Sequence, residues 1–350
     1  KIRTAIEPEI EMRTVYRRSP TSSYEKLSLD GSDEECSSSS MEISTPPPSP
    51  LWLGARNRGV EQWELGKVLF IVSFFWLSAL SNWAVLAYTH DFAGWEPMPD
   101  IVFKFVPEIQ IAHKMGDYFV TSSLICLVLL IVFHKHRLIV FRRMVFIIAT
   151  LYFMRTVTLL GTYLPPSYSD NARRCREQHA NFSLERLGVR MFEQAIRFGM
   201  QDETGKLCGD MLFSGHTLVM MVCMLTVTHY IPKKWRLLRF FPYCFTYVGM
   251  ACMIVSRRHY TIDVVIAHWL TTFVFTSYHA YIESDQFSDR RQSVFHSYAY
   301  FRLIGWLEAN IVPGRLENVF ESPSEAVLAL LGVKPKESAP REKLGVEKIV

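Results

Sequence analysis

Residues 115–133 read MGDYFVTSSLICLVLLIVF, a stretch with no charged side chain after Asp117. A helix needs roughly 20 mainly apolar residues to cross the hydrocarbon core of a bilayer. Only helices and closed barrels satisfy every backbone hydrogen-bonding group in lipid, and a block of this length fits a helix. The stretch therefore predicts a transmembrane helix.

Five further blocks of similar character occur along the chain, at 66–88, 141–162, 211–231, 238–255 and 260–282. Hydrophobic residues make up 49% of the chain, a total that a soluble protein can also reach, so their clustering carries the prediction. We expect an all-α, polytopic membrane protein with six transmembrane helices.

Basic residues predict the orientation of these helices. The loops at 134–143 and 232–239 are dense in Lys and Arg and should be cytosolic, whereas the loop at 89–114 is acidic and should be lumenal or extracellular. The loop at 163–210 must share the lumenal side although it contains six arginines, because long loops follow the charge rule poorly. With six spans, both termini lie in the cytosol.

The long third loop has two features of a lumenal segment. Asn181 begins an Asn-Phe-Ser glycosylation sequon, which is used only in the lumen. Cys175 and Cys208 could form a disulfide in an oxidising compartment, and two free thiols are the alternative.

Three regions follow from this reading. Residues 1–60 contain a serine run and the stretch TPPPSP at 45–50, which predicts a disordered cytosolic tail. Residues 61–285 form the six-helix catalytic domain, and 286–350 form a cytosolic C-terminal tail. The net charge of +4 is small and unevenly placed, so we expect no nucleic-acid binding.

Ionisable residues gather where the fourth and sixth spans meet the lumenal face, in CGDMLFSGHT (208–217) and SRRHYTID (256–263). An ionisable residue inside a membrane boundary, such as His216, is a candidate functional group. His259 and Asp263 are four residues apart and would share one face of a helix. A carboxylate on one imidazole nitrogen fixes the tautomer and leaves the other nitrogen free to attack. We predict His216, His259 and Asp263 as catalytic residues.

Phosphoryl transfer needs a nucleophile, an acid for the departing oxygen and positive charge for the equatorial oxygens. Arg257 and Arg258 offer that charge, although either could instead pair with Asp263. An unpaired arginine inside the third span is costly, and a substrate phosphate would satisfy Arg155. No metal cluster or cofactor motif is visible, and none is expected. The secondary candidates in the two segments are Asp210, Ser214 and Tyr260.

These segments resemble the sphingomyelin synthase family, within the lipid phosphate phosphatase superfamily, over residues 66–285. Residues 97–100, PMPD, resemble its first motif, with Met98 in place of the commoner Leu. The segments that resemble its other three motifs are Arg155 to Thr158 with Leu164-Pro165, Cys208 to Thr217, and His259 to Asp263 with Ala267.

The resemblance implies transfer of phosphocholine from phosphatidylcholine to ceramide, which yields sphingomyelin and diacylglycerol. It implies that His259, oriented by Asp263, attacks phosphorus and that His216 protonates the diacylglycerol oxygen. A phospho-histidine intermediate then passes its group to ceramide. It also implies a Golgi or plasma membrane location, with the active site lumenal or extracellular.

Three alternatives stay open. Some family members use phosphatidylethanolamine and make ceramide phosphoethanolamine. A lipid phosphate phosphatase would use the same histidines with water as acceptor; Ser256-Arg257 resembles its third motif, but its Lys-x6-Arg-Pro segment is absent from the sequence. A scaffold or transporter is the third alternative. Oligomeric state is open, including a homo-oligomer.

Overall fold

A computed structural model of the chain describes residues 17–18, 24–25, 64–168, 170–179, 181, 183–197, 205–284, 291–311 and 315–321. The chain divides into two compact units, residues 1–52 and 53–350. In the first unit, β1 (Arg17–Arg18) and β2 (Tyr24–Glu25) pair antiparallel. The rest of the expected disordered tail, 1–60, lies outside the described residues.

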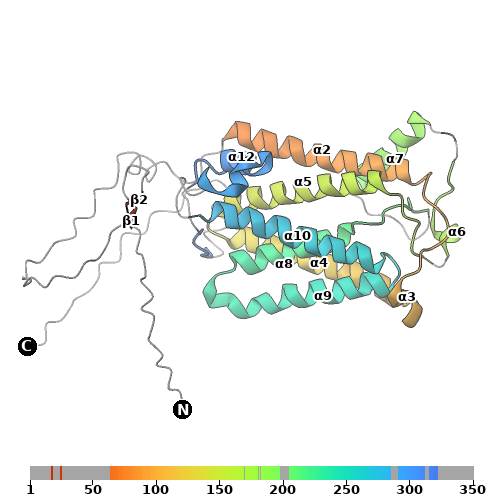
Figure 1. Cartoon of the computed structure of the whole chain (residues 1–350). Coiled ribbons are helices and arrows are strands. Elements are labelled where there is room, and N and C mark those ends of the chain that lie inside the picture. Colours follow the sequence, from red (N-terminus) through yellow and green to blue (C-terminus); the bar gives the residue numbers. More distant parts are fainter. Residues whose placement is uncertain are drawn as a thin grey trace, which may run out of the picture. The chain divides into compact units, whose positions relative to one another are not determined.

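The second unit is a bundle of helices whose longest members run side by side (Figure 1). Each of these helices overlaps one of the six expected spans, so the helical class is confirmed for this unit. They are α2 (Leu65–Thr89), α4 (Gln110–Phe133), α5 (Arg137–Gly161), α8 (Gly215–Tyr230), α9 (Phe240–Val255) and α10 (Thr261–Ile282).

Four stretches of the described chain are long and apolar enough to cross a membrane: α2, α4, α5 and residues 233–255. The last combines η1 (Lys233–Arg239) with α9. Helix α8 is shorter, at 16 residues, and α10 carries Asp263, His268 and His279 among its apolar residues. The structure is therefore that of a membrane-spanning bundle, with four helices of the expected type.

Short elements cover the two ends of the bundle. One end carries α3 (Ile101–Phe105), α6 (Asn171–Arg174) and α7 (Leu184–Ile196), and α12 (Ala299–Leu307) lies at the other (Figure 1). A short 3₁₀ helix, η2 (Val294–Ser297), precedes α12.

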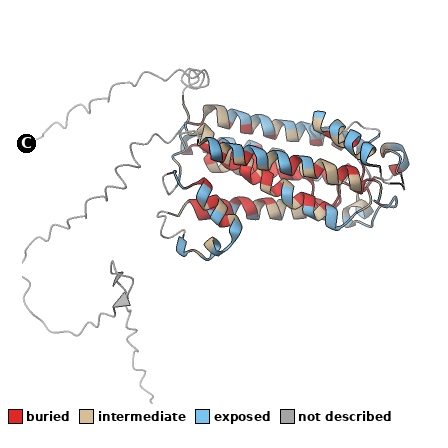
Figure 2. Cartoon of the chain, turned by 90° about the horizontal axis from the view of Figure 1, so that it is seen from above, coloured by how far each residue is buried: buried red, intermediate tan, exposed pale blue. Residues whose placement is uncertain are grey.

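Helix α8 lies in the middle of the bundle, in contact with α4, α5, α9 and α10, and most of its side chains are buried. Buried residues follow the inner faces of the helices, while exposed residues line the outside (Figure 2). Two glycines permit the close approach of α4, α8 and α9. A Cβ on Gly116 would lie 2.7 Å from Met253, and one on Gly249 would lie 2.5 Å from Met220.

A buried ion pair closes the end of the bundle that carries α12. Arg143 of α5 donates to Glu308 from Nη2, at 2.5 Å, and from Nε, at 3.2 Å. Tyr278 also donates to Glu308, at 3.1 Å. Burial raises the pKa of Glu308, but Arg143 outweighs this effect and holds the pKa below its ordinary value.

This ion pair anchors the segment that contains α12. Phe301, Ile304 and Leu307 of α12 lie in the same core cluster as side chains of α5, α8 and α10. Residues 299–308, which the sequence analysis groups with the C-terminal tail, therefore pack as part of the bundle.

Substituting Glu308→Gln should destabilise the protein, because it leaves the Arg143 guanidinium buried without a counter-charge. Removing one partner of a buried pair costs about 3–5 kcal/mol. We expect a lower Tm in detergent than for the control Glu317→Gln, a change of an exposed carboxylate in the same C-terminal segment. Equal Tm values for the two variants would show that the ion pair does not hold α12 in place.

Candidate active site

The two segments that carry the predicted catalytic residues meet at the end of the bundle that carries α3, α6 and α7. Residues 208–214 lead into α8, and 256–260 join α9 to α10. His216 is the second residue of α8, and its ring centre lies 6.0 Å from that of His259. The backbone N–H of Ser214 donates to the carbonyl of Asp263 at 3.4 Å, so the two segments are also joined directly.

Asp263 is fully buried and binds both segments. Its Oδ1 accepts the backbone N–H of Leu212 at 2.8 Å, and its Oδ2 accepts that of Tyr260 at 3.0 Å. Nδ1 of His259 lies 3.5 Å from the same Oδ2. The structure thus brings His216, His259 and Asp263 together, with Asp263 behind His259.

The reason for the contact between His259 and Asp263 differs from the expected one. His259 is not helical; it lies in the loop before α10, and Tyr260 is the N-cap of that helix. Asp263 is the third helical residue, and its side chain reaches back to the N-cap N–H in a capping box. The Asp263 carboxylate therefore contacts His259 while it caps the N-terminus of α10.

The loop before α8 contains a residue in a costly conformation. Leu212 has a φ of +87°, in the left-handed region that residues other than glycine seldom adopt. Its N–H is the one that binds Asp263. Backbone strain of about 1–3 kcal/mol persists only where surrounding contacts over-determine it, and here the buried carboxylate supplies such a contact.

The two histidines differ in accessibility. The side chain of His259 is 4% exposed, whereas that of His216 is 36% exposed. Burial lowers the pKa of His259 below its ordinary value of 6.5, although the neighbouring Asp263 opposes this shift. The His259 imidazole is thus kept neutral, which is the form that can act as a nucleophile.

Arg257 and Arg258, adjacent in the chain, point to different places. Arg258 pairs with Asp117 on α4, beside His216. Arg257 has a φ of +54° and lies over the ring of Phe103, with its guanidinium carbon 5.1 Å from the ring centre. Arg258 is therefore beside the histidines, whereas Arg257 lines a separate pocket of about 450 Å³ beside α3.

Arg155 has protein partners, so the expectation of an unpaired arginine is wrong. It donates to the carbonyl of Phe213 at 2.7 Å and to Oδ1 of Asn82 at 2.6 Å, and it pairs with Asp210. A Cβ on Gly215 would lie 3.5 Å from its guanidinium carbon. Arg155 therefore supports the segment before α8; a role in binding phosphate stays a prediction.

The secondary candidates all make structural contacts. Asp210 is the ion-pair partner of Arg155. Ser214 caps α8, and its Oγ accepts the N–H of Thr217 at 3.3 Å. The hydroxyl of Tyr260 donates to the carbonyl of Pro165 at 3.1 Å and accepts the N–H of Met98 at 2.9 Å.

Asp100 joins the first of the four family-like segments to α10. Its Oδ2 accepts the N–H of Thr261 at 2.8 Å, and its Oδ1 accepts that residue's hydroxyl at 2.9 Å. Together with Tyr260, it brings residues 97–100 and 165–166 against the start of α10. All four segments therefore contribute to one end of the bundle.

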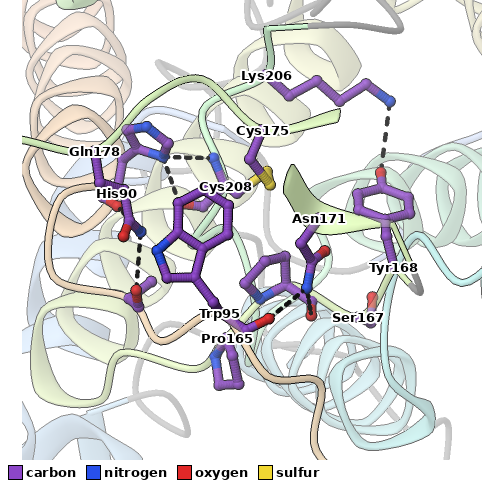
Figure 3. The surroundings of a disulfide bond; sticks show 12 residues. His90, Trp95, Pro165, Ser167, Tyr168, Asn171, Cys175, Gln178, Lys206 and Cys208 are labelled. Carbon is purple, nitrogen blue, oxygen red and sulfur yellow. Dashed lines mark hydrogen bonds between the residues drawn. A yellow bond between two sulfur atoms is a disulfide. The ribbon is translucent and has the colours of Figure 1, made fainter. Parts of the chain in front are cut away.

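A disulfide joins Cys175 to Cys208, which decides between the two alternatives for these cysteines (Figure 3). Next to it, residues 174–176 and Lys206 form a parallel β-bridge. Nδ1 of His90 accepts the N–H of Cys208 at 2.9 Å, and burial lowers the pKa of that histidine. The start of the segment 208–217 is thus fixed to the loop after α2 and to the end of α6.

Asp117 is a site residue that the sequence analysis missed. Its Oδ1 lies 3.8 Å from Nε2 of His216, and Arg258 donates to the same oxygen. The available signal was an acidic residue inside the expected span 115–133. Among the described residues, no group of three or more His, Cys, Asp or Glu side chains could hold a metal ion.

Comparison with known proteins identifies relatives that cover the site. Residues 207–280 match the family model described as PAP2 superfamily C-terminal, and they include both histidines and Asp263. The chain is 48% identical to the Putative phosphatidylcholine:ceramide cholinephosphotransferase 3 of Caenorhabditis elegans, over 74% of this chain and 76% of that protein.

Two further relatives extend the comparison. Phosphatidylcholine:ceramide cholinephosphotransferase 2 of Caenorhabditis elegans is 35% identical, over 71% of this chain and 75% of that protein. Sphingomyelin synthase-related protein 1 of Homo sapiens is 30% identical, over 63% of this chain and 52% of that protein.

Replacing both Cys175 and Cys208 by Ser should lower the Tm, because loss of a native disulfide typically costs about 2–5 kcal/mol. A reductant should lower the wild-type Tm toward that of the double variant and leave the double variant unchanged. Cys252→Ser, at a free cysteine of α9, is the control and should respond to reductant like the wild type. A wild-type Tm that does not respond to reductant would contradict the disulfide.

Proposed function

The chain belongs to the sphingomyelin synthase family of the PAP2 superfamily, and from this premise we propose that it transfers phosphocholine from phosphatidylcholine to ceramide. The products are sphingomyelin and diacylglycerol. The observation that carries the proposal is the pair of His216 and His259, whose ring centres lie 6.0 Å apart, with the buried carboxylate of Asp263 behind His259. The names of the relatives support the choice of donor and acceptor.

The first half of the reaction transfers phosphocholine from phosphatidylcholine to His259. Because Nδ1 of His259 faces Asp263, Nε2 is the nitrogen that attacks phosphorus. A bond from phosphorus to Nε2 forms, and the bond from phosphorus to the diacylglycerol oxygen breaks. Protonated His216 gives its proton to that oxygen, and diacylglycerol leaves.

The second half returns the group to a lipid acceptor. Neutral His216 takes the proton of the ceramide hydroxyl, whose oxygen attacks phosphorus. The bond to Nε2 of His259 breaks, sphingomyelin leaves and both histidines regain their initial states. The greater exposure of His216 supports this assignment, because its ring must meet two successive lipid oxygens.

Positive charge near the transferred phosphate comes first from Arg258, which lies beside His216. Arg155 acts from behind the loop, where its contact with Phe213 and its ion pair with Asp210 keep that loop in place. Arg257 faces the pocket beside α3 and can contact a lipid headgroup there. These roles combine charge stabilisation with positioning.

The proposal extends to six transmembrane helices, with α8 and α10 among them and both termini in the cytosol. The histidines then face the lumen of the Golgi or the outside of the plasma membrane. The disulfide supports this side of the membrane, because it requires an oxidising compartment. Residues 61–285 supply the catalytic domain, and α12 adds to its cytosolic end.

The direct test is a transfer assay with the purified protein in vesicles of phosphatidylcholine and a fluorescent ceramide. We expect labelled sphingomyelin from the wild type. His259→Ala should lose about three orders of magnitude or more in rate, because positioning cannot replace a missing nucleophile. Release of phosphocholine or phosphate without labelled sphingomyelin would favour a phosphatase.

The matched control is His268→Ala, which removes another histidine, on the helix that follows His259. His268 lies on α10 in ring contact with Tyr247, and it should retain transfer activity. Equal lipid handling by His259→Ala and the wild type would favour a transporter or scaffold.

The lowered pKa of His259 predicts how the rate depends on pH. A histidine whose pKa lies below 6.5 stays neutral as the pH falls through 6.5, and it loses its nucleophilic form only at a lower pH. We therefore expect the acid limb of kcat/KM for phosphatidylcholine to have its midpoint below pH 6.5. A midpoint above that value would mean that His259 is not the group whose neutral form is required.

A further inference from the structure

Asp117 has no assigned part in the transfer chemistry, yet it lies next to the reacting groups. Arg258 donates a hydrogen bond to Oδ1 of Asp117, and Nε2 of His216 lies 3.8 Å from the same oxygen. Its side chain is 51% exposed, so a ligand at the histidines can reach it.

The packing of the bundle determines where this carboxylate lies. Asp117 directly follows Gly116, the glycine of α4 that faces Met253 of α9. A side chain at Gly116 would separate α4 from α9, and Arg258 follows shortly after the end of α9. The backbone of Asp117 is thus held by a close helix contact.

Three other carboxylates of this region are less exposed than that of Asp117 and have partners of their own. Asp263 is buried, and both of its oxygens accept backbone N–H groups. Asp210 pairs with Arg155, and Glu108 pairs with Arg174. Of these four acids, Asp117 has the most exposed side chain, and it is the one that lies within 4 Å of His216.

The pair formed by Arg258 and Asp117 matches the charges of the proposed donor. Phosphocholine carries an anionic phosphate and, two carbons away, a quaternary ammonium. A phosphate that reaches the histidines also reaches Arg258, and it competes with Asp117 for that guanidinium. The released carboxylate then faces the ammonium, so that opposite charges meet at both positions.

We propose that Asp117 binds the ammonium of the donor headgroup and makes the enzyme selective for cationic headgroups. This inference rests on the proposed phosphocholine transfer and deepens it. A quaternary ammonium cannot donate a hydrogen bond, so the attraction is one between charges. A carboxylate suits that task whether or not aromatic rings also contact the methyl groups.

The test compares two donors of the same shape, phosphatidylcholine and its analogue with a 3,3-dimethylbutyl headgroup, in which carbon replaces the charged nitrogen. Each is presented in vesicles with fluorescent ceramide, and kcat/KM is measured for the wild type and for Asp117→Asn. The wild type should prefer the choline donor. Asp117→Asn should lower kcat/KM for that donor by about fivefold and leave the neutral analogue nearly unchanged, as expected for one partly exposed charge contact.

The control is Asp91→Asn, which removes a carboxylate paired with Arg190 outside the histidine site. It should keep the wild-type ratio between the donors even if its total activity changes. Asp117→Glu, which retains the charge, should restore part of the preference.

The outcomes separate this inference from the proposed function. If Asp117→Asn lowers kcat/KM equally for both donors, Asp117 only positions Arg258 or His216, and headgroup selection by this residue is wrong. If the wild type transfers neither headgroup to ceramide, the proposed function fails and the subsite that depends on it fails too.

Discussion

The buried carboxylate of Asp263 is the contact on which the candidate active site depends. A carboxylate without water is costly unless hydrogen bonds satisfy it. Asp263 meets this requirement with the N–H groups of Leu212, in the loop that leads into α8 and His216, and of Tyr260, in the loop that carries His259. Satisfying one charge therefore fixes both loops, and His259 is held against the same oxygen that accepts from Tyr260.

The remaining polar contacts support this arrangement from the outside. Arg155 binds the loop before α8 through Phe213 and Asp210, and the disulfide of Cys208 anchors the start of that loop. Tyr260 and Asp100 tie further loops to the start of α10. At the opposite end, the ion pair between Arg143 of α5 and Glu308, which follows α12, closes the bundle. The apolar helices thus form the scaffold, and buried charges determine how its two ends are organised.

The sequence predicts much of the fold because apolar blocks of membrane-spanning length are a strong signal, and each expected span overlaps a long helix. It does not predict the packing of α12, since a short amphipathic helix in a polar tail resembles any surface segment.

The spacing of His259 and Asp263 predicts their contact. The expected reason was a shared helix face, whereas in the structure Asp263 contacts His259 from a helix cap. Arg257 and Arg258 look equivalent in sequence, but Arg257 has a left-handed backbone and lies over Phe103, whereas Arg258 pairs with Asp117. Asp117 was missed because its partners come from distant parts of the chain, His216 on α8 and Arg258 in the loop before α10.

We propose that His259, held by Asp263, is the nucleophile that carries the transferred phosphocholine. The most direct measurement is mass spectrometry of the protein after incubation with phosphatidylcholine in the absence of ceramide, quenched at alkaline pH to preserve a phospho-histidine. We expect a phosphocholine adduct on the peptide that contains His259, discharged when ceramide is added. An adduct on His216, or turnover to sphingomyelin with no adduct on either histidine, would contradict it.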